Sequence, residues 1–269
     1  MAIGKIKIGS LEISRFIIGG NPFSGFSHQG DARDAEMKHY YTVAKIKETL
    51  RQAESLGITT HLSRSDHHVI RYMMEYRDEG GKMVWLAQTC PEIGNTLRGV
   101  QNAINGGAMA CHIHGGWMDY LLANNQLDEL PQAVAAIRKA GMPAGLAGHN
   151  PKVFQWAEKN LDVDYYMCSY YNSAHRDRRA EHVPGMEEWF LEEDRRVMTQ
   201  LIQGLSKPVI HYKVLAAGRN DPQEAFDVVA RHLRPQDAVC VGIDTKRFPN
   251  SIADNIRMFE QSLKKAGKE

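Results

Sequence analysis

The sequence predicts a (β/α)8 barrel, formed as a single domain over residues 1–269 and preceded by a β-hairpin. Eight short apolar runs recur along the chain, and an amphipathic segment with helical spacing follows each of them. Strand–helix alternation of this kind favours a parallel sheet covered by helices, and 269 residues suit one such barrel. The runs are Ile17–Gly19, Thr59–His61, Val84–Leu86, Met109–Ile113, Ala144–Ala147, Tyr165–Cys168, Val209–His211 and Ala238–Gly242.

The elements around these runs have recognisable ends. Lys5–Ser14 reads as a hairpin of two short strands around a Gly-Ser turn, and we expect it to close the bottom of the barrel. A first helix is predicted over Ala35–Ser55, with Gly57 ending it. Pro222 falls in the first turn of the helix after the seventh run. Other helices are indicated by apolar positions at helical spacing: Ile93, Leu97, Val100 and Ile104; Leu127, Leu130, Val134 and Ile137; Phe226, Val229, Ala230 and Leu233; Ile252, Ile256, Phe259 and Leu263.

Composition argues for a small-molecule substrate. The net charge is +1, from 33 basic and 32 acidic residues, which gives no sign of a nucleic-acid or membrane partner. No apolar stretch approaches the roughly 20 residues that span a bilayer, and Met1–Ser10 lacks a signal-peptide core. We expect a cytoplasmic protein, compatible with a homo-oligomer. The four cysteines have no CxxC spacing and are expected to be buried free thiols.

Polar residues come just after the apolar runs. In a barrel these positions form one ring at the C-terminal mouth, where the chemistry of this fold takes place. The sequence therefore predicts where the site is. The ring comprises Asn21, Arg64, Asp66, Gln88, His114, His149, Tyr170, Tyr171, Lys213 and Asp244.

Two histidines of this ring are candidates for acid–base or metal chemistry. His112 and His114 share one face of the fourth strand, and His114 is nearer the mouth, which favours it for proton transfer. Asn150, directly before Pro151, suits the N-cap of the next helix. His149 is therefore not needed as a cap and is expected at the mouth. A divalent metal on His114 and His149, with Asp66, is one alternative. A histidine hydrogen-bonded inside the barrel is the other.

Charged residues of the ring suit an anionic ligand. Arg64 could hold a carboxylate or phosphate bidentately, while Asp66 is either an N-cap or a catalytic group. Lys213 could act as a base or Schiff-base nucleophile, although anion binding is preferred. The last two loops of such barrels commonly bind phosphate. Residues there that suit a phosphate are Gly218, Arg219, Thr245, Lys246 and Arg247.

The connection Asn172–Met186 is long and rich in charged residues. Loops of this length in a compact domain are usually functional or mobile. The segment is either a lid over the mouth or a solvated excursion on the surface.

Several segments together resemble the aldo-keto reductase superfamily. They are ISRFIIGGNPF, CHIHGG, GLAGHNPKVFQWAEKN, DVDYYMCSYYN, KPVIHYKVLAAGR and VCVGIDTKRFPNSIADNIRMF, which span most of the chain. The resemblance implies that His114 matches the family's catalytic histidine. It also implies that Gly218, Arg219, Thr245, Lys246 and Arg247 fall where the phosphates of NADP bind.

The rest of the family's catalytic set has no counterpart. No Tyr stands after the second strand, where His67 falls nearest, and Gln88 or Thr89 replaces the expected Lys. Ala147-Gly148 replaces the Ser-Asn pair that holds the nicotinamide. Among tyrosines elsewhere, Tyr170, Tyr171 and Tyr212 are the candidates to replace the missing acid.

These observations favour a barrel enzyme of altered chemistry. We expect a lyase, isomerase or hydrolase that transfers protons on a small sugar or carbonyl compound, with His114 and His149 as acid and base. A divergent NADP-dependent reductase is the first alternative. A non-catalytic sensing or binding barrel is the second.

Overall fold

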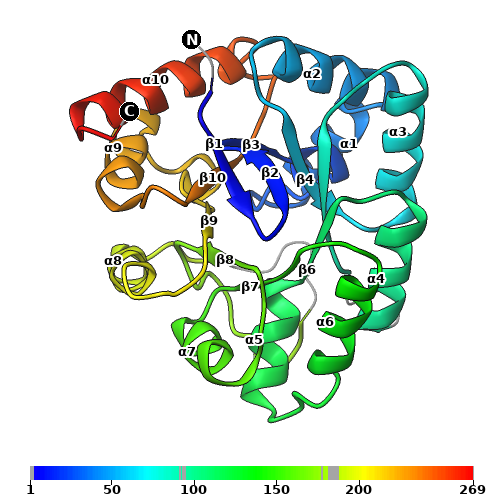
Figure 1. Cartoon of the computed structure of the whole chain (residues 1–269). Helices are drawn as coiled ribbons and strands as arrows, with labels where there is room; N and C mark the ends of the chain where they lie inside the picture. The colour runs from blue at the N-terminus through cyan, green and yellow to red at the C-terminus, as the bar shows by residue number, and fades with distance from the viewer. Residues whose placement is uncertain (1–2, 91, 93–94, 177, 181–187, 269) are drawn as a thin grey trace.

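Eight parallel strands close into a barrel in the computed structural model, which confirms the predicted fold (Figure 1). The structure describes residues 3–90, 92, 95–176, 178–180 and 188–268. Each strand pairs with its neighbours in chain order, and β10 closes the ring against β3. The strands are β3 (Phe16–Gly19), β4 (Thr60–Arg64), β5 (Val84–Gln88), β6 (Ala110–Ile113), β7 (Ala144–Gly148), β8 (Tyr165–Ser169), β9 (Val209–Tyr212) and β10 (Ala238–Gly242).

The predicted hairpin covers the bottom of the barrel. β1 (Lys5–Ile8) and β2 (Leu11–Ser14) pair antiparallel around a turn at Gly9, and Ile6, Ile8 and Ile13 pack against side chains of the barrel interior. Figure 1 shows the hairpin across the end of the barrel that faces the viewer. The hairpin therefore covers the N-terminal ends of the strands and leaves the opposite mouth as the place for a ligand site.

Large side chains fill the barrel interior below the mouth. A Cβ on Gly145 would lie 2.4 Å from the ring of Tyr165, so the missing side chain makes room for that ring. The Tyr165 hydroxyl lies 3.3 Å from Nδ1 of His112, whose Nε2 lies 3.4 Å from Oε1 of Gln88. Burial lowers the pKa of His112 to about 3, so its imidazole is neutral. His112 is therefore an interior packing residue beneath the site.

Helices surround the barrel, and one predicted helix proves to be two. The sequence indicated a continuous helix over residues 35–55, but α1 (Asp31–Tyr40) ends before α2 (Val43–Ser55) begins. The side chain of Thr42 caps α2 by accepting from the Lys45 amide, and the Tyr41 hydroxyl donates to the carbonyl of Ile243. The break ties the helix layer to the loop after β10. The remaining helices are α3 (His67–Asp78), α4 (Thr96–Asn105), α5 (Gly115–Ala123), α6 (Leu130–Lys139), α7 (Pro151–Asn160), α8 (Glu192–Ile202), α9 (Pro222–His232) and α10 (Ser251–Lys265).

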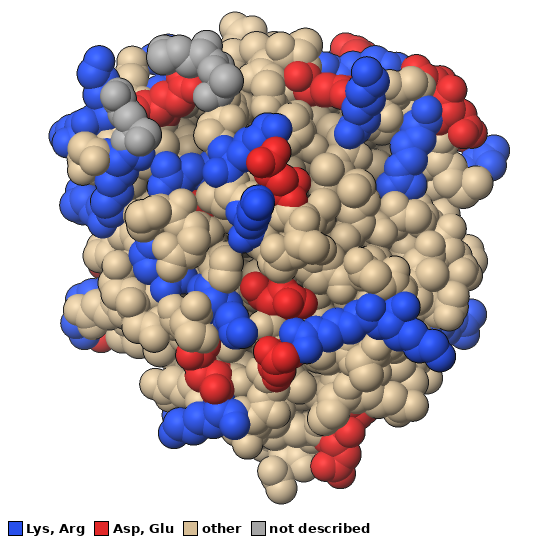
Figure 2. Space-filling view, viewed as in Figure 1, with Lys and Arg blue, Asp and Glu red and all other residues tan. Residues whose placement is uncertain are grey.

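Within the described ranges, no helix has both the length and the apolar character needed to cross a membrane. Figure 2 shows basic and acidic side chains interspersed over the face that carries the hairpin. All four cysteines are buried free thiols, as predicted.

Candidate active site

A cavity of about 120 Å³ opens at the carboxyl ends of the strands. Six residues predicted for the ring line it, from β3, β4, β5, β6, β7 and β9 or directly after them. These are Asn21, Arg64, Gln88, His114, His149 and Lys213. The other lining residues are Phe26, His28, Glu92, Gly115, Arg176 and Tyr212. The structure thus brings side chains from distant segments together around one opening.

His149 lies between a carboxylate and a phenol. Its Nδ1 is 2.7 Å from Oδ2 of Asp119, and its Nε2 is 3.2 Å from the Tyr212 hydroxyl. A carboxylate only accepts, so Nδ1 carries the proton and the lone pair of Nε2 faces Tyr212. Backbone amides of His149 and Asn150 also donate to Asp119, which fixes that carboxylate in place. Asp119, His149 and Tyr212 thus form a continuous hydrogen-bonded chain that ends in the cavity.

Burial sets the protonation states of this chain. It lowers the pKa of His149, against the opposing effect of Asp119, and raises that of Tyr212 well above its ordinary value. The imidazole is therefore a neutral base and the phenol a neutral acid near pH 7. A Cβ on Gly115 would lie 3.0 Å from the Tyr212 hydroxyl, so this glycine leaves the space in front of the pair open.

His114 is held in the opposite tautomer. It is the N-cap of α5, and its Nδ1 accepts from the Trp117 amide at 3.2 Å. In the neutral ring the proton is then on Nε2, and burial lowers the pKa of His114 well below its ordinary value. His114 is thus a neutral N–H donor on the cavity wall, suited to a carbonyl oxygen.

Asp66 takes the first of its two predicted roles, the N-cap of the following helix. One oxygen caps α3 by accepting from the Val69 amide at 3.0 Å, and the other accepts from Nε of Arg64 at 2.8 Å. Arg64 also pairs with Glu92 and lies over the ring of Phe26. Asp66 therefore orients the guanidinium that lines the cavity and is not itself among the lining residues.

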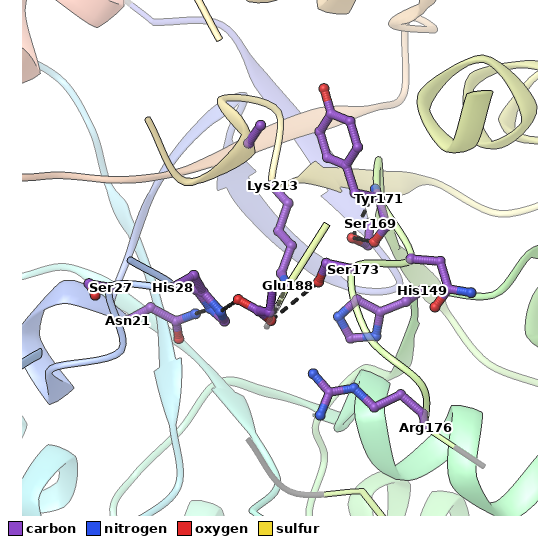
Figure 3. A network of polar contacts seen from close by, with 12 residues as sticks. Asn21, Ser27, His28, His149, Ser169, Tyr171, Ser173, Arg176, Glu188 and Lys213 are labelled. Atoms are coloured by element: carbon purple, nitrogen blue, oxygen red, sulfur yellow. Dashed lines mark hydrogen bonds and ion pairs between the residues drawn. The ribbon is translucent and has the colours of Figure 1, made fainter. Parts of the chain in front are cut away.

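A second polar network occupies the other side of the cavity (Figure 3). Glu188 is its centre: one oxygen lies 2.7 Å from Nδ1 of His28, and the other accepts from Ser173 at 3.3 Å. The Ser173 hydroxyl in turn accepts from Nζ of Lys213 at 3.0 Å. Figure 3 shows His149 and Arg176 on the adjoining side of this network. The lysine is therefore connected through a hydroxyl to a carboxylate that is itself 3% exposed.

The ionisation of Lys213 should make the stability of the protein depend on pH. Burial lowers its pKa from 10.5 to about 8. The folded chain then loses this proton at lower pH than the unfolded chain, so stability rises with pH between those values. Between pH 7.5 and 9.5, the free energy of unfolding of the wild type should rise by roughly 2 kcal/mol more than that of Lys213→Met. Urea unfolding at both pH values measures this difference, and equal changes in the two proteins would contradict it.

Tyr170 and Tyr171 do not line the cavity. The Tyr170 hydroxyl lies 3.0 Å from Nδ1 of His211 in a buried cluster, and the Tyr171 hydroxyl accepts from Asn220 at 2.7 Å. Of the three tyrosines considered as replacement acids, Tyr212 is the one that reaches the site.

The residues predicted to bind phosphate form ion pairs and hydrogen bonds with other parts of the protein. Lys246 and Arg247 both pair with Glu36 of α1, and the buried Thr245 hydroxyl lies 3.3 Å from those of two tyrosines. Arg219 lies over the ring of Phe190 and donates to the carbonyls of His28 and Ala216. These residues, and Gly218, are not among those that line the cavity.

The metal alternative has no ligand set in the part of the chain that the structure describes. No three His, Cys, Asp or Glu side chains are grouped there so that they could hold one ion. Nδ1 of His149 bonds to Asp119, that of His114 accepts from a backbone amide, and Asp66 pairs with Arg64.

Several residues of the site were not predicted from the sequence, among them Asp119, His28, Arg176 and Glu188. Asp119 lies on α5, five residues after His114, and nothing in its local sequence marks it. His28, Arg176 and Glu188 come from loops that run over the mouth. The only signal for the last two was the length of the connection after β8. Of the predicted segment Asn172–Met186, residue 177 and residues 181–186 lie outside the described residues. Within the described part, Arg176 lines the cavity. The amide of Trp189, just beyond the segment, donates to the carbonyl of Ser173.

Solved structures share this architecture. An aldo-keto reductase from Bacillus halodurans superposes with a TM-score of 0.62 at 12% identity, covering 98% of this chain and 96% of that one. The N-acetylmannosamine-6-phosphate 2-epimerase of Clostridium perfringens gives 0.53 at 11% identity, covering 89% and 92%. An aldolase gives 0.50 at 12% identity, covering 80% and 93%. No family model and no curated protein sequence matches the chain. At these identities the likeness establishes the fold, a barrel of the kind that aldo-keto reductases have.

Proposed function

We propose that the protein is an acid–base enzyme, a lyase or isomerase, that moves a proton on the carbon next to the carbonyl group of a small oxo compound. The observation that carries this proposal is the chain Asp119–His149–Tyr212, which places a neutral base and a neutral acid 3.2 Å apart at the cavity. Groups of this kind accelerate proton transfer by roughly 10²- to 10⁴-fold when they are positioned at the reacting atom.

The roles follow from the tautomers. The phenol oxygen of Tyr212 takes the substrate proton as its own proton passes to Nε2 of His149, and Asp119 stabilises the imidazolium that forms. The Nε2–H group of His114 donates to the carbonyl oxygen, where negative charge develops. The proton returns by the same route.

The charges around the cavity favour a substrate with an anionic group. Arg64, which is held by Asp66 and Glu92, and the buried Arg176 both line the cavity. Guanidinium groups bind carboxylates and phosphates in a bidentate geometry. Small oxo acids and phosphorylated sugars are the compounds that combine such a group with an acidic carbon–hydrogen bond.

Exchange with deuterium tests the reaction directly. We expect wild-type protein in D2O to remove the α-proton signal of at least one compound in a panel of small oxo acids and phosphorylated ketoses, followed by proton NMR. His149→Gln should lower that rate at least 100-fold. His39→Gln, an exposed histidine on α1, is the matched control. Exchange that is unchanged in His149→Gln would refute the proposed base.

The alternative is a divergent NADP-dependent reductase, suggested by the likeness of the barrel to aldo-keto reductases. Glu36 already pairs with both Lys246 and Arg247, and hydrogen bonds from Lys246 and Arg33 lower its own pKa to about 2. We therefore expect no saturable change in NADPH fluorescence at micromolar protein. Tight binding would place the reductase first.

A further inference from the structure

The backbone holds Lys213 in a conformation that residues with side chains rarely adopt. Its φ is +57°, in the left-handed region, directly after β9, and His28 on the facing loop has the same φ. Such a conformation costs on the order of 1 kcal/mol or more and persists where the surrounding structure enforces it, often at functional sites. Here it places the amine of Lys213 at the cavity, beside Ser173 and Glu188 (Figure 3).

The surroundings of this amine differ from those of a simple anion-binding lysine. The nearest oxygen of Glu188 is 3.8 Å away, and the same carboxylate pairs with His28 at 2.7 Å. The side chain is 11% exposed, and Phe190 covers it at 5.8 Å from the ring centroid. Burial and the neighbouring charge of Arg176 lower the pKa of Lys213 to about 8. Lys213 is therefore a free amine in roughly a tenth of the molecules at pH 7.

We propose that Lys213 is a nucleophile that forms a Schiff base with the carbonyl carbon of a small oxo compound bearing a carboxylate or phosphate. Arg176, which lines the cavity, supplies permanent positive charge for the anionic group, while the charge of Arg64 is offset by Asp66 and Glu92. With the anion bound elsewhere, the amine of Lys213 is the group that attacks the carbonyl carbon. This inference rests on the proposed function of the same site.

The step balances with the groups present. The ammonium first passes a proton through the Ser173 hydroxyl to Glu188, and the amine lone pair then adds to the carbonyl carbon. The nitrogen loses a proton to the former carbonyl oxygen, and the resulting hydroxyl takes back the proton held by Glu188 and leaves as water. The sum is an ammonium and a carbonyl giving an iminium and water, with no oxidant or reductant. The iminium then withdraws electrons from the neighbouring carbon, which makes its hydrogen easier for the Tyr212–His149 pair to remove.

Borohydride trapping tests the proposal. Wild-type protein is mixed with glyoxylate or pyruvate at millimolar concentration, reduced with sodium borohydride, and measured by intact mass and peptide mapping. We expect one added group per chain, with the mass of the oxo acid less one oxygen atom, on the peptide that contains Lys213. Lys213→Arg keeps the charge without the nucleophile and should lose at least 90% of that label. Lys5→Met, on the exposed hairpin, should keep it.

The outcomes are distinct. No label on wild-type protein with either acid, or a label that maps to other lysines and persists in Lys213→Arg, overturns the Schiff base. Mapping on wild-type protein does not depend on how any variant folds. If deuterium exchange proceeds in wild type and in Lys213→Arg without any trapping, the Schiff base fails while the proposed function stands. If Lys213 is trapped but no deuterium exchange occurs, the Schiff base stands while the proposed function fails.

Discussion

Asn in place of Asp119 is expected to slow α-proton exchange by about 10²- to 10⁴-fold while the barrel stays folded. Oδ1 of Asp119 accepts from the backbone amides of His149 and Asn150, and Oδ2 faces Nδ1 of His149. The amide oxygen of Asn can keep the two backbone bonds. Its NH2 group then points at Nδ1 as a donor, so the proton of the imidazole must move to Nε2. Nε2 would then face Tyr212 as a donor, and the phenol would lose the base that takes its proton.

Rate and stability together test this tautomer argument. Exchange is followed by NMR and stability by urea unfolding in the same buffer. Asp221→Asn is the matched control, since Asp221 caps α9 by accepting from the Glu224 amide and Asn caps helices equally well. Exchange by Asp119→Asn within threefold of wild type would show that the His149 tautomer does not matter. A large fall in the unfolding midpoint would instead assign Asp119 a structural role.

The position of the site could be predicted from sequence because a barrel converts chain order into geometry. Residues at the ends of parallel strands meet at one mouth whatever their distance along the chain. Asn21, Arg64, Gln88, His149 and Lys213 are brought together for this reason alone.

What the sequence could not show depends on contacts made outside the strands. Asp119 reaches His149 from a helix, and no periodicity indicates which helical carboxylate turns toward the mouth. Glu36 pairs with Arg247 across 211 positions, an interaction that the local composition of the last loop does not indicate. Tyr170 and Tyr171 were expected at the mouth because they follow β8, but both point into buried clusters. Directions of side chains beyond a strand end are set by packing, which local pattern does not encode.

Loss of the charge of Arg176 is expected to raise the KM for an anionic substrate by roughly 10- to 100-fold and to change kcat much less. The guanidinium is buried, with the residue 7% exposed, and it lines the cavity, where a charge-assisted hydrogen bond contributes about 1.5–3 kcal/mol. Arg176→Met removes this contact and keeps much of the apolar stem. A neutral analogue of the same carbonyl compound should show little change in KM.

The same substitution has a second effect that a purely structural role would not produce. The positive charge of Arg176 helps to lower the pKa values of Lys213, His149 and His114. The yield of borohydride trapping rises with pH as Lys213 becomes a free amine. Arg176→Met should therefore shift this rise to higher pH. Arg178→Met, an exposed arginine two positions further along, should leave both KM and this rise unchanged. An unchanged KM with an unchanged rise would mean that Arg176 neither binds the anion nor acts on the amine, and the anionic substrate class would lose its main support.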